Sequence, residues 1–422
     1  MSTEIASSSP LPELPSEIWL NIFRLATFIP LETDLSVTKL ELGLFSTYDS
    51  YHLQAFEKVL PLRRTIVQVS RRFYEIGIEI LYTTFHIDSE GIINSVPRSL
   101  LFSNLLVSRP ELGRFVKRLS LQWTDEDEEK NYRIISRCPN VFIFSSFQPV
   151  RYVGRRPWWG RGLPKTIRCF DARVYNTPVN DIVSLLEALP NLELLHLWPL
   201  TGYPNPHAPV CLSALRILSI HCSNIDHDTS PSPTFLSGAQ LPSVITLATN
   251  VAHVHARLSL PLNVLRGLVY LQAPGAWAYS GHHSDHFHNL RCLEIPIIQT
   301  AGLQPCLAYF PFHQLERLTV IARFITTSEW RRSVEAVVVT PLDARTMPKL
   351  KHFQLTWGYH GIYGYYHQIV DEAGDGEDFI EYFENLVRRF EERNVLFVVT
   401  NNEVICPGFQ LVRDVLVACK RS

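Results

Sequence analysis

A six-residue pattern recurs along most of the chain and limits what the chain can fold into. Apolar residues occupy its first and fourth positions and usually its sixth, which is sometimes small or polar. The pattern begins at Val116, Val141, Ile167, Leu192, Leu215, Val244, Leu268, Leu290, Leu315 and Leu350. Successive starts are 25, 26, 25, 23, 29, 24, 22, 25 and 35 residues apart. Such a period indicates a solenoid, in which each repeat adds one strand and stacked neighbours bury the apolar residues.

The pattern resembles the strand segment of leucine-rich repeats, whose period is about 20 to 29 residues. Regular members carry Asn or Cys three residues after the last apolar position, where the side chain satisfies backbone groups of the turn. Neither type occurs at the ten equivalent positions, which are Thr124, Pro149, Tyr175, Leu200, Ser223, Ala252, Ala276, Ile298, Arg323 and Gly358. We therefore expect an irregular leucine-rich-repeat-like solenoid with a parallel sheet over residues 98–400, an α/β fold.

Helical segments are expected between and after these strands. Residues 180–189 have helical periodicity, with Asn180 or Asp181 as the N-cap. Beyond the last pattern we expect a helix over 378–393, a strand from Val395 and a helix over 409–420. Residues 401–422 would then form a C-terminal cap, because the last unit of a solenoid otherwise exposes its apolar core.

The N-terminal region has a different character. Residues 1–11 are rich in serine and are expected to be a disordered tail, and an amphipathic helix is expected from Leu14 to Ala26. Ile18, Ile22, Leu25 and Ala26 recur at helical spacing, while Trp19 and Phe23 form a second apolar ridge. Two ridges are more apolar surface than one small core face needs, which indicates a protein partner.

The segment LPSEIWLNIF, from Leu14, resembles the opening of an F-box, and Val67 to Ile76 resembles its closing helix, with a basic pair before an aromatic residue. The resemblance assigns 12–88 to an F-box-like helical region, interrupted by an insertion at 30–62. It implies docking onto a Skp-type adaptor linked to a cullin, with Leu14, Pro15, Ile18, Ile22 and Phe23 as the contact residues. The chain would then be the substrate-recognition subunit of an SCF-type ubiquitin ligase. Two alternatives stay open: these helices only cap the array, or the chain is a repeat scaffold for protein–protein interaction with no link to ubiquitin.

A protein target is expected on the concave side of the sheet. Side chains alternate between the two faces of a strand, so the residues between the apolar positions would line this surface. The candidate target-binding residues are Arg118, Arg173, His196, Trp198, His221 and Arg317. Trp198 could instead pack under the loop that follows it.

Composition favours a soluble cytoplasmic or nuclear protein. The formal net charge is −2, so no general field attracts nucleic acid or anionic lipid. The eight cysteines are widely spaced and form no secreted-type framework. The first residues lack the basic and apolar segments of a signal peptide, and no apolar run is long enough to span a membrane.

No catalytic motif is found, and we expect neither an enzyme nor a cofactor or metal. The sequence contains no phosphate loop, no G-x-S-x-G elbow and no H-E-x-x-H helix. The segment GHHSDHFH, from Gly281, has metal-capable side chains but is more typical of a solvated connection. The basic, aromatic VGRRPWWGRG, from Val153, is expected to be an exposed loop, and WGYHGIYGYYHQI, from Trp357, fits either a binding loop or a packed cover.

Overall fold

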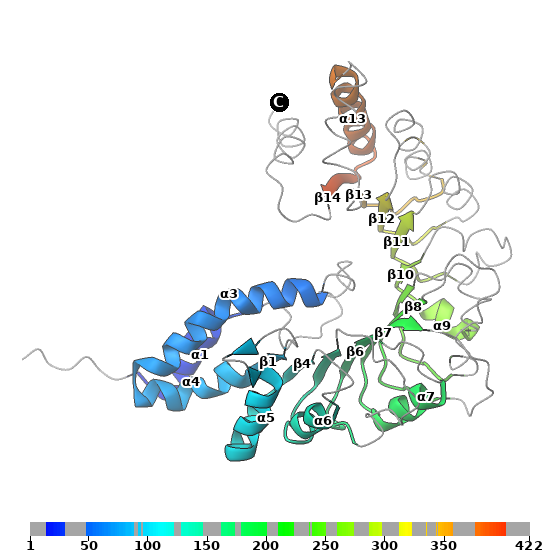
Figure 1. Ribbon diagram of the computed structural model, residues 1–422. Helices are drawn as coiled ribbons and strands as arrows, with labels where there is room; N and C mark the ends of the chain where they lie inside the picture. Colours follow the sequence, from blue (N-terminus) through cyan, green and yellow to red (C-terminus); the bar gives the residue numbers. More distant parts are fainter. Residues whose placement is uncertain are drawn as a thin grey trace, which may run out of the picture. The chain divides into compact units, whose positions relative to one another are not determined.

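The computed structural model is shown in Figure 1. It describes residues 14–29, 48–87, 92–93, 96–121, 128–146, 162–173, 179–200, 210–222, 236, 239–249, 260–273, 287–297, 312–322, 335, 343, 345–357 and 376–401. The chain divides into two compact units, one of residues 1–39 with 46–147 and one of residues 40–45 with 148–422. Each unit is described by itself.

The described part of the first unit begins with three helices, α1 (Ser16–Ala26), α3 (Tyr48–Val69) and α4 (Arg71–Thr83). The prediction of one closing helix through Val67 to Ile76 is wrong, because the helix is interrupted at Ser70. Ser70 has an extended backbone, with φ −160° and ψ 164°, and its Oγ accepts a hydrogen bond from the N–H of Phe73 at 3.1 Å. This is an N-cap, which ends one helix and starts the next.

Residues 48–62, the second half of the segment predicted to be an insertion (30–62), belong to the continuous helix α3. Residues 30–47 lie outside the described part of the chain. α3 packs closely along α4 at Gly77, where an added Cβ would lie 3.1 Å from Ile66 Cγ2 and 3.2 Å from Val67 Cγ1. The long helix is therefore part of the helical core of this unit.

A buried arginine joins the three helices. Arg63 of α3 is only 2% exposed, and its two terminal nitrogens donate to the carbonyls of Thr27 at 3.0 Å and Ile80 at 3.2 Å. Thr27 directly follows α1, and Ile80 lies in α4. The guanidinium thus satisfies one carbonyl beside each neighbouring helix, and it fixes the end of α1 against the other two.

Replacing Arg63 with methionine is expected to lower the free energy of unfolding by about 1–3 kcal/mol. Methionine keeps much of the apolar stem but leaves two buried carbonyls without these donors. Urea unfolding followed by circular dichroism measures the change. The control is Arg64→Met on the exposed side of the same helix, which should change little. An equal loss in both variants would contradict this role of Arg63.

The rest of the first unit carries three parallel strands in the order β1 (Thr84–Ile87), β4 (Arg118–Leu121) and β5 (Ile143–Ser146). β2 (Ile92–Ile93) and β3 (Val96–Pro97) form a short antiparallel pair. The helices are α5 (Arg98–Ser108), the 3₁₀ helix η1 (Pro110–Phe115) and α6 (Glu128–Ser136). β1 was not predicted, although its YTTFHI segment fits the six-residue pattern.

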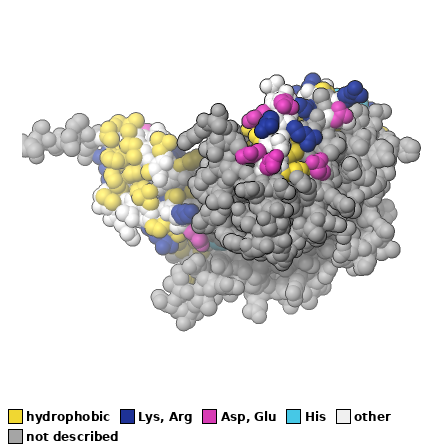
Figure 2. All heavy atoms as spheres, turned by 90° about the horizontal axis from the view of Figure 1, so that it is seen from above, with side chains coloured by type: hydrophobic (Ala, Val, Ile, Leu, Met, Phe, Trp, Pro, Cys, Tyr) yellow, Lys and Arg dark blue, Asp and Glu magenta, His cyan; other side chains and the backbone are white. Residues whose placement is uncertain are grey.

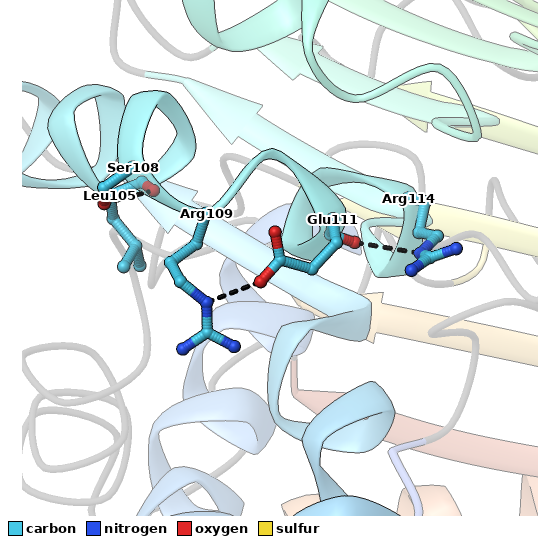
Figure 3. A network of polar contacts seen from close by, with 5 residues as sticks. All are labelled: Leu105, Ser108, Arg109, Glu111 and Arg114. Atoms are coloured by element: carbon cyan, nitrogen blue, oxygen red, sulfur yellow. Dashed lines mark hydrogen bonds and ion pairs between the residues drawn. The ribbon is translucent and has the colours of Figure 1, made fainter.

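Local polar contacts shape the turn from α5 through η1 (Figure 3). Ser108 Oγ donates to the carbonyl of Leu105 at 3.0 Å, and Arg114 Nε donates to the carbonyl of Glu111 at 3.2 Å. Arg109 Nε donates to the Glu111 carboxylate. This hydrogen bond with Arg109 holds the pKa of Glu111 below its usual range. The contacts are exposed, so they orient the chain more than they stabilise it.

The described part of the second unit contains nine parallel strands, whose spatial order follows the sequence (Figure 1). They are β6 (Cys169–Arg173), β7 (Leu194–Leu200), β8 (Ile217–Cys222), β9 (Thr246–Thr249), β10 (Tyr270–Gln272), β11 (Cys292–Ile297), β12 (Arg317–Ala322), β13 (His352–Trp357) and β14 (Leu396–Asn401). The helices among its described residues are α7 (Val179–Ala188), α9 (Leu262–Gly267) and α13 (Gly376–Glu391). All ten predicted patterns form strands, and the strand from Val395 and the helices near 180–189 and 378–393 are confirmed. The predicted helix over 409–420 lies outside the described residues.

Stacked apolar side chains form the core of the second unit. In β6 to β13 the fourth residues of the pattern lie in register: Phe170, Leu195, Leu218, Leu247, Leu271, Leu293, Leu318 and Phe353, each at most 1% exposed. The first residue of every pattern donates its N–H to the carbonyl three residues earlier, as Leu192 does to Leu189 at 3.2 Å. The same turn therefore precedes each of the ten patterned strands.

Asparagine side chains do connect successive repeats, but they stand directly before the strands, whereas regular leucine-rich repeats carry Asn or Cys after them. The Nδ2 group of Asn191 donates to the carbonyl of Lys165 in the preceding repeat at 3.0 Å, and Asn289 donates likewise to Arg266 at 2.9 Å. Asn140 makes the equivalent bond to Arg114 at 2.7 Å in the first unit. Polar side chains directly before the first apolar position thus link successive turns.

At its far end the array is covered by α13. The ring of Phe390 lies 5.1 Å from that of Phe353 and 4.9 Å from that of Phe397, and it is fully buried.

We expect Phe390→Ala to lower the free energy of unfolding by about 3–5 kcal/mol, because it removes a buried ring and leaves a cavity. Thermal and urea unfolding measure this. Glu391→Ala, at the exposed neighbouring position, is the control, and a Phe390→Ala protein as stable as this control would contradict the packing.

Candidate protein-binding surfaces

One side of α1 exposes a line of apolar side chains. Leu14, Ile18, Ile22 and Leu25 are 41%, 44%, 39% and 78% exposed, and Pro15 is exposed as well. The spacing of Ile18, Ile22 and Leu25 places them on one face of the helix, and Leu14 and Pro15 directly precede it. Figure 2 shows hydrophobic side chains gathered over the N-terminal helices, with few charged groups among them. Such a group of exposed apolar residues is typical of a protein-binding surface.

The opposite side of α1 is fixed to α4. Phe23 is only 4% exposed, and its ring lies 5.0 Å from Phe73 and 5.7 Å from Trp19. The Trp19 ring also lies 4.9 Å from that of Phe73. Phe23 therefore belongs to the interior of this unit. Of the five predicted adaptor contacts, four are exposed, and Phe23 is not, because it packs against the unit's own aromatic cluster.

Polar contacts hold both ends of α1. Arg72 of α4 donates to the carbonyl of Leu14 at 2.7 Å, just before the helix begins. Further along, Arg24 and Glu79 form an ion pair of 3.1 Å. The ion pair is exposed and contributes little energy, but together with the aromatic cluster it limits rotation of the helix. The apolar face is thus presented in one orientation within its unit.

The predicted target-binding residues are less accessible than expected. The alternation of side chains is confirmed, but Arg118 is fully buried and His196 is 9% exposed, so the prediction that they lie on an open surface is wrong. Polar neighbours on that face are also buried, among them Ser120, Ser145, Ser219 and Glu294. Strands about 4.8 Å apart bring short polar side chains together, where they shield and pair with one another. His196 Nδ1, for example, lies 2.9 Å from Asp171 Oδ1.

The remaining four candidates lie on strands β6, β7, β8 and β12. Arg173 and Trp198 pair in register between β6 and β7, and His221 lies in β8, but the side chains of all three lie outside the described part. Arg317 of β12 is half-buried. Of the six candidates, it is the one whose described side chain keeps part of its surface open.

Beside Arg317 lies a buried polar network, which sequence reasoning missed. Tyr270 OH donates to Glu294 Oε2 at 2.8 Å, and Gln272 Nε2 donates to Glu294 Oε1 at 2.6 Å. Burial raises the pKa of Glu294, and these two hydrogen bonds offset part of the effect. Burial and the nearby Glu294 carboxylate raise the pKa of Tyr270 well above its usual value. The sequence feature that could have indicated this network is the register, because the third and fifth residues of neighbouring patterns lie on the same face of the sheet.

The raised pKa of Glu294 has a consequence for stability. Folded Glu294 binds its proton more tightly than the unfolded chain does, so its contribution is present below the unfolded pKa and is lost as pH rises through the folded pKa. We expect the unfolding free energy of Glu294→Gln, relative to the unchanged protein, to increase as pH rises from about 4 to 7. Urea unfolding at several pH values measures the difference. A difference that stays constant with pH would contradict a raised pKa.

The described residues offer little for chemistry. They contain no group of three or more His, Cys, Asp and Glu side chains placed to hold a metal ion. None of the described helices combines the length and apolar character needed to cross a bilayer. Burial raises the pKa of the Cys138 thiol to about 12, so it stays protonated. Apart from Phe287 and His288, the histidine-rich segment lies outside the described residues, as do 153–161 and 358–375.

No protein-family model matches the chain, and no curated protein matches it.

Proposed function

We propose that this protein is a substrate-recognition subunit of an SCF-type ubiquitin ligase. A Skp-type adaptor would bind the exposed face of α1, and the solenoid would bind a protein target. The observation that carries the proposal is the division of α1 into two sides: Ile18 and Ile22 are about two-fifths exposed, while Phe23 is sealed against Phe73. A helix with an apolar face left open suits insertion into a groove of another protein.

The support of α1 favours a preformed docking surface. Arg63 fixes the residue after the helix, and Arg72 fixes the residue before it. A helix that is held before binding loses less conformational freedom when the partner arrives. Burial of the exposed apolar surface can then contribute to affinity with little loss to ordering.

The solenoid supplies the second role. Stacked repeats give an extended sheet whose strands each present different side chains at equivalent positions. No catalytic group is required of this chain, because transfer of ubiquitin would be carried out by other subunits. Its contribution would be to hold the target close to them.

The alternative is a repeat scaffold whose N-terminal helices only cap the array. One observation favours it: α4 ends at Thr83 and β1 begins at Thr84, so the helices lead into the first strand without a linker. The helices and β1, β4 and β5 also belong to the same compact unit. Capping would be carried out by α4, which contacts η1 and β1, whereas docking would use the exposed face of α1, so the two roles can be separated by experiment.

Ile18→Ser with Ile22→Ser in the full chain is expected to weaken capture of a purified Skp-type adaptor roughly 30- to 1,000-fold. Each exposed isoleucine that becomes buried at the centre of an interface contributes about 1–2 kcal/mol. Affinity is measured by biolayer interferometry, and circular dichroism checks that the helices persist. Both residues point away from the aromatic cluster, so folding should be retained.

The matched control is Leu101→Ser with Val107→Ser on α5. These residues are 40% and 55% exposed in the same unit, so they test unspecific apolar contact. The proposal requires that this control bind the adaptor as the unchanged protein does. If the unchanged full chain is folded but captures no adaptor, the ubiquitin role is rejected and the scaffold alternative remains.

A further inference from the structure

An arginine that has no counterion among the described residues lies on the polar face of the second unit. Arg317 of β12 is half-buried, and it pairs in register with Cys292 on β11 and His352 on β13. Within the described residues, no hydrogen bond or ion pair engages its guanidinium. A cation that is partly withdrawn from water and carries five N–H donors normally finds an acceptor.

The carboxylate on the neighbouring strand does not fill this role. Glu294 of β11 lies on the same face, but its two oxygens accept from Tyr270 and Gln272 of β10, at 2.8 Å and 2.6 Å. Both partners are on the side away from β12. Burial also raises the pKa of Glu294, which reduces its negative charge. On the far side, β14 places the apolar Leu396 in register with His352.

His352 is a second donor beside the arginine. Burial, and then the charge of Arg317, lower its pKa, so the imidazole is neutral near pH 7. Its Nδ1 is enclosed and has no hydrogen-bond partner among the described residues. This leaves Nε2 as the nitrogen that can meet a ligand. Thr319 and Gln354, half-buried and two residues further along the same strands, add polar side chains to that face.

We propose that Arg317 and His352 form an anion-binding site that receives a carboxylate or phosphate group of the protein target. This deepens the proposed target recognition and rests on it. Arginine binds both groups through two parallel N–H···O bonds, and partial burial strengthens such bonds. The Nε2–H tautomer of His352 would donate a further hydrogen bond. A nucleic acid fits the site less well, because one cation in a chain of net charge −2 cannot follow a phosphate backbone.

The test uses the full chain with two defined probes, sodium phosphate and sodium acetate, each exchanged for sodium chloride at constant ionic strength. Binding is followed by NMR of histidine rings labelled with carbon-13, and the signal of His352 is assigned from its loss in His352→Gln. We expect the His352 signal to shift saturably with at least one anion. A response to acetate indicates carboxylate recognition, and a response to phosphate alone indicates a phosphorylated target.

Arg317→Gln is expected to weaken this binding at least roughly tenfold, the loss of one charge-assisted bidentate contact. Arg291→Gln is the matched control: it removes one positive charge from the adjoining repeat at a side chain that is 65% exposed and lies near Glu316. Arg317→Lys, which keeps the charge, should bind with intermediate affinity and also serves if Arg317→Gln does not fold.

The proposal is overturned if neither anion shifts the His352 signal saturably. It is equally overturned if Arg291→Gln weakens binding as much as Arg317→Gln, since the effect would then be diffuse electrostatics. Anion binding does not require the face of α1, so failure of adaptor capture with an intact anion response would reject the ubiquitin role and leave the site in place.

Discussion

The common register of the parallel strands determines which side chains lie on the apolar face of the sheet and which lie on the polar face. Leu195, Leu218 and Leu247 stack directly over one another with no exposed surface. Side chains alternate with a period of two, so a slip of one residue would turn this row outward and bring its polar neighbours into the core. A turn with the same hydrogen bond precedes each of the ten patterned strands and opposes such a slip, because it fixes where the first apolar residue enters. The positions of Glu294, Arg317 and His352 follow from that register.

The sequence predicts the strands well because their apolar spacing is sharp, and every one of the ten patterns forms a parallel strand. It predicts the N-terminal helices less well. Val67 to Ile76 is amphipathic throughout, and only the capping bond of Ser70 reveals the break. β1 was missed because its pattern is the last segment of a helical region, where no neighbouring repeat precedes it.

Side-chain exposure was harder to predict than backbone structure. Both ridges of α1 are apolar, and nothing in the spacing says which ridge meets the unit's own helices. The answer depends on Phe73, which lies 50 residues beyond Phe23 and packs on it. The burial of Arg118 and His196 has a similar origin, because alternation assigns a side chain to a face but says nothing of how closely that face is filled. Periodicity is local, whereas burial is set by contacts between distant segments.

The asparagines that precede the strands have a consequence for how such a chain can vary. Successive repeats are joined through their strands, and at Asn140, Asn191 and Asn289 also through a side chain that reaches a carbonyl of the preceding turn. These contacts do not fix the length of the connection between one strand and the next turn, which agrees with pattern spacings that range from 22 to 35 residues. Insertions and deletions can therefore accumulate in the connections while the sheet keeps its geometry. An array built in this way can diverge in length and composition until little similarity to any relative remains.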